Sequence, residues 1–288
     1  MSTTTATTPW KTTPTRTVDV AGTAFAYREL GPRGGVPVVF LHHLHAILDE
    51  WDPRTVDGIA AGRHVITFDN RGVGATGGKV PATVEAMADD AAAFIRALGH
   101  EQVDLFGFSL GGGVAQSVLL RHPQLVRRAI LAGTGPAGAG GLEKMPLIAG
   151  SAYVKALLTL RNPKHFLFFP RTSTGKAAAT DYMARLKERT TDLDKPVSPQ
   201  ARIAQLRAIV TAGGQAPYDL GIITQPVFVA NGDHDVMVAS AHSEDLARRI
   251  PGAQLIMYPD SGHGGVFQYH EQFVPAVLEF LRAGDTVA

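Results

Sequence analysis

The sequence of 288 residues contains no cysteine. This absence excludes a disulfide-linked scaffold, a zinc–thiolate site and a cysteine nucleophile. The first fifteen residues are rich in threonine and lack the apolar core of a signal peptide, and the longest apolar stretches, such as Val36–Leu41, are far too short to cross a bilayer. We therefore expect a cytoplasmic protein that has no association with a membrane.

The sequence also lacks an excess of charge of either sign. Its 27 Lys and Arg residues are balanced by 26 Asp and Glu residues, which gives a net charge of +1. There is no basic run and no RNA-binding motif, so a nucleic acid is not an expected partner. Phosphate-binding loops, dinucleotide-binding glycine patterns and metal-binding patterns are absent as well. The expected partner is a small-molecule substrate, with no cofactor and no metal; the sequence leaves open whether the chain forms a homo-oligomer.

What the sequence does contain is an alternation of short β-branched runs with helical patterns. This order predicts an α/β fold with a mostly parallel sheet flanked by helices. A hairpin is expected around Ala21 and Gly22, between Thr17–Val20 and Thr23–Arg28. The remaining strands are expected in the runs Val36–Leu41, His64–Phe68, Val103–Phe106, Arg128–Ala132, Pro226–Ala230 and Ala253–Tyr258.

The alternation breaks between residues 137 and 220, where only helical patterns occur. We interpret this segment as an all-helical lid inserted before the last two strands, because an ordinary crossover connection needs far fewer residues. A few plain crossover helices are the alternative. The core domain then comprises residues 17–136 and 221–288, and residues 1–16 form a disordered or loosely docked N-terminal tail.

One motif indicates a catalytic function because of the predicted elements on either side of it. The run Gly107-Phe108-Ser109-Leu110-Gly111 follows a predicted strand and opens a predicted helix. A nucleophilic serine on such a tight turn needs glycines two residues before and after it, and the helix N-terminus behind it favours negative charge. A glycine-rich turn with an incidental serine is the alternative for the motif taken alone.

Together with the motifs that follow it, this turn resembles the α/β-hydrolase family, in particular its lid-bearing esterase, haloperoxidase-like and C–C hydrolase branch. The likeness extends over residues 17–283. The resemblance implies a Ser-His-Asp triad with the acid after the penultimate strand and the histidine after the last one. In this sequence these positions select Asp235 and His263. Asp233 is the alternative acid.

The resemblance also implies an oxyanion hole formed by two backbone N–H groups. One belongs to Leu110, directly after the nucleophile, and the other to Leu44 in the loop after the first parallel strand. His43 stands where the family usually has glycine; it either lines the site or only bonds a backbone carbonyl. The segment 69–76 resembles a further family signature, to which we assign an architectural role.

The predicted activity is hydrolysis of a carboxylic ester or lactone of a small, largely apolar substrate by a serine hydrolase. The same triad allows two alternative activities. One is cleavage of a C–C bond in a β-diketone-like substrate, and the other is cofactor-free haloperoxidase or perhydrolase activity. A non-catalytic ligand-binding receptor is the alternative from another class. Besides His43, the residues expected to line the substrate pocket are Met145, Leu157, Phe166 and Phe169, with Phe168 beside them.

Overall fold

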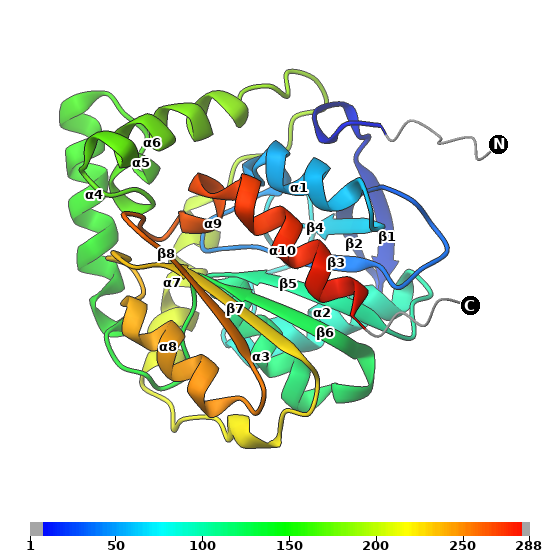
Figure 1. Ribbon diagram of the computed structural model, residues 1–288. Coiled ribbons are helices and arrows are strands. Elements are labelled where there is room, and N and C mark those ends of the chain that lie inside the picture. Colours follow the sequence, from blue (N-terminus) through cyan, green and yellow to red (C-terminus); the bar gives the residue numbers. More distant parts are fainter. Residues whose placement is uncertain (1–7, 284–288) are drawn as a thin grey trace.

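The computed structural model describes residues 8–283, and its centre is an eight-stranded sheet (Figure 1). The strand order is β1-β2-β4-β3-β5-β6-β7-β8, with antiparallel pairing only where β2 meets β1 and β4. The predicted hairpin and the predicted parallel strands are therefore confirmed. The strands are β1 (Arg16–Val20), β2 (Thr23–Leu30), β3 (Val38–Leu41), β4 (Val65–Phe68), β5 (Val103–Phe108), β6 (Val126–Ala132), β7 (Val227–Gly232) and β8 (Gln254–Tyr258).

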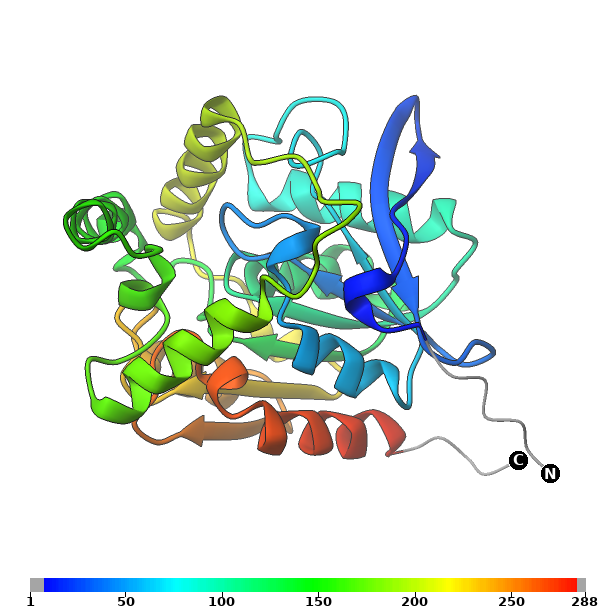
Figure 2. The same ribbon diagram turned by 90° about the horizontal axis from the view of Figure 1, so that it is seen from above.

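Helices cover both faces of this sheet (Figures 1 and 2). The helices of the core are α1 (Pro53–Ala60), α2 (Val84–Ala97), α3 (Leu110–Arg121), α8 (Ser240–Arg249), α9 (Gly265–Gln268) and α10 (His270–Arg282), with single 3-10 turns η2 (Leu48–Glu50) and η3 (Pro123–Leu125). Helices α2 and α3 pack together on one face, and α1 packs with α10 on the other. Central parallel strands are consequently buried on both sides, which explains why they appear as continuous apolar runs.

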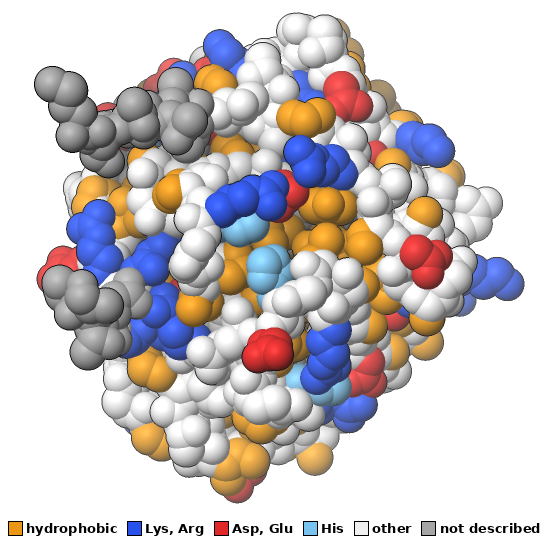
Figure 3. Space-filling model, turned by 90° about the vertical axis from the view of Figure 1, so that its right-hand side faces the viewer, with side chains coloured by type: hydrophobic (Ala, Val, Ile, Leu, Met, Phe, Trp, Pro, Cys, Tyr) orange, Lys and Arg blue, Asp and Glu red, His pale blue; other side chains and the backbone are white. Residues whose placement is uncertain are grey.

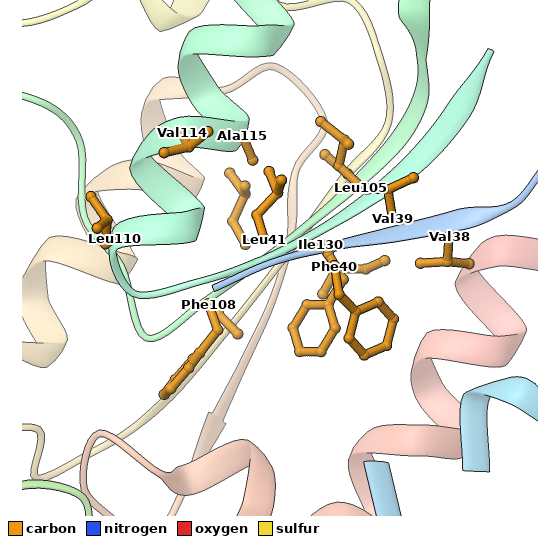
Figure 4. Close-up of a cluster of buried hydrophobic side chains, with 14 of the residues drawn as sticks. Val38, Val39, Phe40, Leu41, Leu105, Phe108, Leu110, Val114, Ala115 and Ile130 are labelled. Carbon is orange, nitrogen blue, oxygen red and sulfur yellow. The ribbon is translucent and has the colours of Figure 1, made fainter. Parts of the chain in front are cut away.

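The alternation of side chains within β3 shows this double burial (Figure 4). Val39 and Leu41 point toward α3, whereas Val38 and Phe40 point toward the opposite layer, and all four are buried. A charged side chain at any of these positions would lose its hydration without gaining a partner. An unbroken apolar run is therefore what this place in the sheet requires.

Between β6 and β7 the chain leaves the sheet for a helical insertion, residues 137–220. It contains η4 (Leu142–Lys144), α4 (Met145–Thr159), α5 (Lys164–Leu167), α6 (Ser173–Arg185) and α7 (Pro199–Gly213), and the turn η5 (Leu220–Ile222) leads from it to β7. The insertion lies over the edge of the sheet where the parallel strands end (Figures 1 and 2). A buried ion pair ties it to the core, since Arg185 of α6 bonds both carboxylate oxygens of Asp52 at 2.7 and 3.1 Å.

The N-terminal segment differs from its prediction. Residues 1–7 of the expected tail lie outside the described residues, but Trp10–Thr12 form the 3-10 turn η1 and the Trp10 side chain is only 1 % exposed. Its backbone N–H donates to the carboxylate of Asp57 at 2.6 Å. Loose docking is therefore wrong for residues 10–16. The threonine- and proline-rich composition of this segment does not predict that the indole ring of Trp10 buries a large apolar area.

The face of the molecule shown in Figure 3 carries both basic and acidic side chains. This dispersion agrees with the near-zero net charge. Within residues 8–283 no helix is long and apolar enough to span a membrane.

A pair of carboxyl groups joins the insertion to the core. Asp69, directly after β4, is fully buried and accepts hydrogen bonds from the N–H groups of Leu48 (3.0 Å) and Ala75 (3.3 Å). Asp194 of the insertion accepts from the same Leu48 N–H at 3.3 Å. Burial raises the pKa of Asp69 well above its usual value, and hydrogen bonding with Asp194 and its negative charge add to the rise. His42, 4.0 Å from Asp69, offers no compensating charge, because burial lowers its pKa to about 3.

This carboxyl pair makes the stability of the protein depend on pH. Because the pKa of Asp69 is higher in the folded state, its contribution is fully present below the unfolded pKa of about 3.9 and is lost as the pH rises through the folded value. Asp194→Asn removes the like charge, so we expect the Tm to rise by roughly 2–4 °C at pH 8, with a smaller gain at pH 5. Thermal unfolding at both pH values, with the exposed Asp181→Asn as control, checks this. Equal gains at the two pH values would contradict it.

Candidate active site

Ser109 occupies the turn between β5 and α3 in a strained conformation. Its φ of 56° and ψ of −115° lie in a region that residues with a side chain rarely adopt. The turn is tight because the helix starts against neighbouring backbone: a Cβ at Gly107 would overlap the carbonyl of Gly111, and a Cβ at Gly111 would overlap that of Leu41. Both glycines of the motif are therefore required by close approach, as the sequence predicted.

The loops after β7 and β8 bring an acid and a base together. The Nδ1 atom of His263 lies 2.7 Å from Oδ2 of Asp235, and both side chains are fully buried. The other oxygen of Asp235 accepts from the N–H groups of Met237 (2.7 Å) and Val238 (3.0 Å), which fixes the carboxylate. Because a carboxylate only accepts, Nδ1 carries the proton and Nε2 of the neutral ring carries a lone pair. Nε2 has no partner among residues 8–283, and the ring borders the same cavity as Ser109.

Asp233, the alternative acid, and His270, at the start of the last helix, lie elsewhere. Asp233 contacts the exposed His234 at 2.5 Å and accepts from the N–H of Ser261, so it supports the loop rather than the imidazole of His263. His270 is the first residue of α10 and borders a different groove, next to α6. The geometry therefore favours Asp235 and His263, the pair expected from the sequence.

Two backbone N–H groups are placed to receive negative charge near the serine. Leu110 is the first residue of α3, so its N–H has no partner within the helix. Leu44 lies in the loop after β3, and its N–H has no acceptor in the described part of the chain. Leu110 and Leu44 border the cavities on either side of Ser109. This arrangement suits an oxyanion hole.

His43 combines the two roles that the sequence left open. Its Nδ1–H donates to the carbonyl of Leu44 at 2.9 Å, and its ring borders the cavity. Burial, with the nearby positive charge of Lys164, lowers the pKa of His43 well below 6.5, so the ring is neutral. Its Nε2 is then a buried acceptor without a partner. The ring is held edge-on against Phe108 and Phe168, with centroids 5.4 and 5.3 Å apart.

The cluster of histidines around His43 does not resemble a metal site. Within residues 8–283, no three His, Asp or Glu side chains are grouped as metal ligands.

Ser109 borders two cavities, one almost entirely apolar and one of mixed chemistry with several polar side chains. The apolar chamber has a volume of about 60 Å³, and its wall includes Val84, Leu110, Met145, Ile209, Tyr218 and Val238. The polar chamber has a volume of about 180 Å³, and its wall includes His43, His45, Glu50, Lys164, Arg202 and His263. A substrate bound across the serine would thus meet apolar groups on one side and hydrogen-bonding groups on the other.

Comparison with known proteins agrees with this geometry. Residues 36–268 match the family model described as alpha/beta hydrolase fold. This chain belongs to the α/β-hydrolase family. A solved structure of an alpha/beta hydrolase fold protein from Chitinophaga pinensis is 37 % identical, with a TM-score of 0.91 over 97 % of this chain and 100 % of that chain.

Curated relatives of this α/β-hydrolase have diverse names. A putative non-heme bromoperoxidase from Mycobacterium tuberculosis is 29 % identical over 86 % of this chain and 95 % of its own length. A putative carbamate hydrolase from Agrobacterium fabrum is 27 % identical over 82 % of this chain and 88 % of its own. The family is thus established, whereas the names of the relatives do not converge on one substrate.

The pocket residues expected from the sequence separate into two groups. Met145 borders the apolar chamber and His43 the polar one. Leu157 is wrong, because it lies on the outer side of α4 and is 76 % exposed. Phe166 and Phe169 are also wrong: they border a groove that does not include Ser109. Their neighbour Phe168 borders the polar chamber instead.

The polar residues of the insertion had no signal in the sequence. Lys164 and Arg202 belong to no motif, and they reach the site only because α5 and α7 fold over the sheet edge. His45 follows the recognised loop, but a single histidine there carries no pattern. Only the three-dimensional placement of the insertion could have identified these residues.

The choice between the two acids is testable. Asp235→Asn should lower kcat by about 10⁴-fold, because it removes the group that fixes the His263 tautomer and stabilises the imidazolium. Asp233→Asn, the matched control two residues away, should change kcat less than about threefold. Steady-state kinetics on a p-nitrophenyl ester measure both. A large loss for Asp233→Asn with little loss for Asp235→Asn would reverse the assignment.

Proposed function

We propose that this α/β-hydrolase cleaves a carboxylic ester or lactone through an acyl-enzyme on Ser109. The observation that carries the proposal is the 2.7 Å hydrogen bond between His263 Nδ1 and Asp235 Oδ2, which leaves Nε2 as a free base beside the serine cavity. A serine hydroxyl needs such a base to act as a nucleophile at neutral pH. The relative named a putative carbamate hydrolase supports attack at a carbonyl carbon.

In the first half of the reaction, Ser109 Oγ attacks the carbonyl carbon while its proton moves to His263 Nε2. The carbonyl oxygen becomes an oxyanion, which accepts hydrogen bonds from the N–H groups of Leu44 and Leu110, each worth on the order of 3 kcal/mol. Asp235 stabilises the imidazolium. When the tetrahedral intermediate collapses, the bond from the carbonyl carbon to the leaving oxygen breaks, and that oxygen takes the proton from Nε2.

The second half repeats these steps with water. His263 accepts a proton from a water molecule as its oxygen attacks the acyl carbon, and the oxyanion forms again in the same place. The bond to Ser109 Oγ then breaks and the serine recovers its proton from Nε2. The products are a carboxylic acid and the free alcohol, or a hydroxy acid if the substrate is a lactone.

The volume of the apolar chamber limits the length of the acyl chain that a substrate can carry. A cavity of about 60 Å³ walled by aliphatic side chains suits a short acyl chain. Among p-nitrophenyl esters we therefore expect kcat/KM to be highest at two to four carbons and to fall by about tenfold or more at eight carbons. Met145→Ala, which widens this chamber, should move the optimum to longer chains, and Met183→Ala, outside it, should not. An optimum at long chains in the wild type would contradict this prediction.

The nucleophile is tested by burst kinetics. Ser109→Ala should abolish the burst of p-nitrophenol and lower turnover by at least about 10³-fold, because no acyl-enzyme can form. Ser151→Ala, on the exposed side of α4, is the matched control and should behave as the wild type.

The alternatives give different outcomes in the same set of assays. Ser109-dependent cleavage of a vinylogous diketo acid without turnover of any short ester would establish C–C hydrolysis in place of the proposal. Halogenation that depends on a carboxylic acid and peroxide, without ester turnover, would favour perhydrolysis. Tight binding of small ligands with no Ser109-dependent turnover of any substrate would identify a receptor.

A further inference from the structure

The position of His263 decides which chamber receives which half of the substrate. The leaving oxygen must take its proton from His263 Nε2, so the leaving group has to lie on the side of that ring. His263 borders the polar chamber and not the apolar one. If the proposed serine mechanism holds, the acyl group therefore enters the apolar chamber and the leaving group enters the polar chamber.

We propose that the polar chamber binds an uncharged leaving group that carries hydroxyl groups, such as the glycerol part of a glycerol monoester. This inference rests on the proposed function and names the alcohol part of its substrate. It comes from the hydrogen-bonding capacity of the chamber wall, which contains buried acceptors and free donors side by side.

Among the described residues, two acceptors on this wall have no hydrogen-bond partner. His43 is almost fully buried, and its Nε2 lone pair is unsatisfied once Nδ1–H bonds the carbonyl of Leu44. Oε2 of Glu50 is likewise buried without a hydrogen bond. Leaving such atoms unpaired costs free energy, so the wall favours a ligand that brings donors.

The same wall also offers donors. Nζ of Lys164 has three N–H bonds and lies 2.6 Å from Oε1 of Glu50, which leaves two of them for other acceptors. Asn162 also borders the chamber; its Oδ1 accepts from the backbone N–H of Lys164 at 3.0 Å, and its NH₂ group is a further donor. A hydroxyl group both donates and accepts, so two neighbouring hydroxyls can satisfy His43 and Glu50 while accepting from Lys164.

The part of the chamber next to His43 and Glu50 suits an uncharged ligand better than a carboxylate. Lys164 is paired with Glu50 there, and burial lowers the pKa values of both His43 and His45. Arg202 keeps its positive charge, but its guanidinium is held by Tyr153 Oη at 2.9 Å and by the carbonyl of Val197 at 3.3 Å. A carboxylate here would face the unpaired oxygen of Glu50 and the lone pair of His43, which repel it.

The size of the chamber agrees with a small polyol. A cavity needs roughly 10–15 Å³ of volume to hold one water. At about 180 Å³ the chamber has room for a glycerol unit with water beside it.

Three esters of butyric acid test the inference on the unmodified enzyme: the propyl ester, the 2,3-dihydroxypropyl ester and the 2-carboxyethyl ester. We expect kcat/KM for the dihydroxypropyl ester to exceed that for the propyl ester by about tenfold, the effect of one or two hydrogen bonds, and the carboxyethyl ester to be the slowest. A carboxyethyl ester that is the fastest substrate would overturn the inference in favour of an anion site. A dihydroxypropyl ester no faster than the propyl ester would overturn it as well.

Glu50→Gln tests the named acceptor. The substitution replaces one acceptor oxygen by an NH₂ donor and leaves Lys164 without its counter-charge. We expect the preference for the dihydroxypropyl over the propyl ester to fall by about fivefold and the carboxyethyl ester to gain by a similar factor. Glu188→Gln, which removes an exposed carboxylate paired with Arg54, is the matched control and should change neither ratio.

The activity on p-nitrophenyl butyrate separates this inference from the function it rests on. Its leaving group has no hydroxyl to bond the wall, so it reports the serine chemistry alone. No Ser109-dependent turnover of this ester would refute the proposed function. Normal turnover of it, without a preference for the dihydroxypropyl ester, would refute only the inference about the polar chamber.

Discussion

The site depends on one close contact, between the first turn of α3 and the end of β3. Gly111 lies so close to the carbonyl of Leu41 that no side chain fits between them. This contact places the N-terminus of α3 beside the loop that follows β3, so that the N–H groups of Leu110 and Leu44 come to the same serine. The unfavourable φ of Ser109 follows from the same geometry, since the chain must turn from strand to helix in one residue. Packing elsewhere in the core compensates for the free-energy cost of this strained backbone.

The polar chamber and the apolar chamber owe their difference to the parts of the chain that wall them. Ile209 of α7 and Met145 at the start of α4 give the apolar side its character. The polar side is formed where the loop after β3, with His43 and Glu50, meets α5 of the insertion. Both walls thus combine core and insertion, while Ser109, His263 and Asp235 come from the core alone. Such a division lets a family keep one reaction while its substrates change.

Much of the fold and the centre of the site could be predicted from the sequence, for a physical reason. Parallel strands end at one edge of the sheet, so Ser109, Asp235 and His263, each directly after a strand, had to lie near one another. The pocket could not be predicted in the same way. Phe166, Phe168 and Phe169 are equally apolar, and only the orientation of α5 on the sheet brings Phe168 to the cavity and turns its neighbours away. Trp10 escaped prediction because a single buried ring leaves no periodic pattern.

Phe168 connects the helical insertion to the loop that carries His263. Its carbonyl accepts from the N–H of Gly264 at 2.8 Å, and its ring contacts both His263 and His43, with centroids 5.4 and 5.3 Å away. Phe168 therefore lines the polar chamber and also supports the loop that carries His263. The position of His263 in the structure therefore depends on contacts from two separate parts of the chain, the carboxylate of Asp235 and the backbone and ring of Phe168.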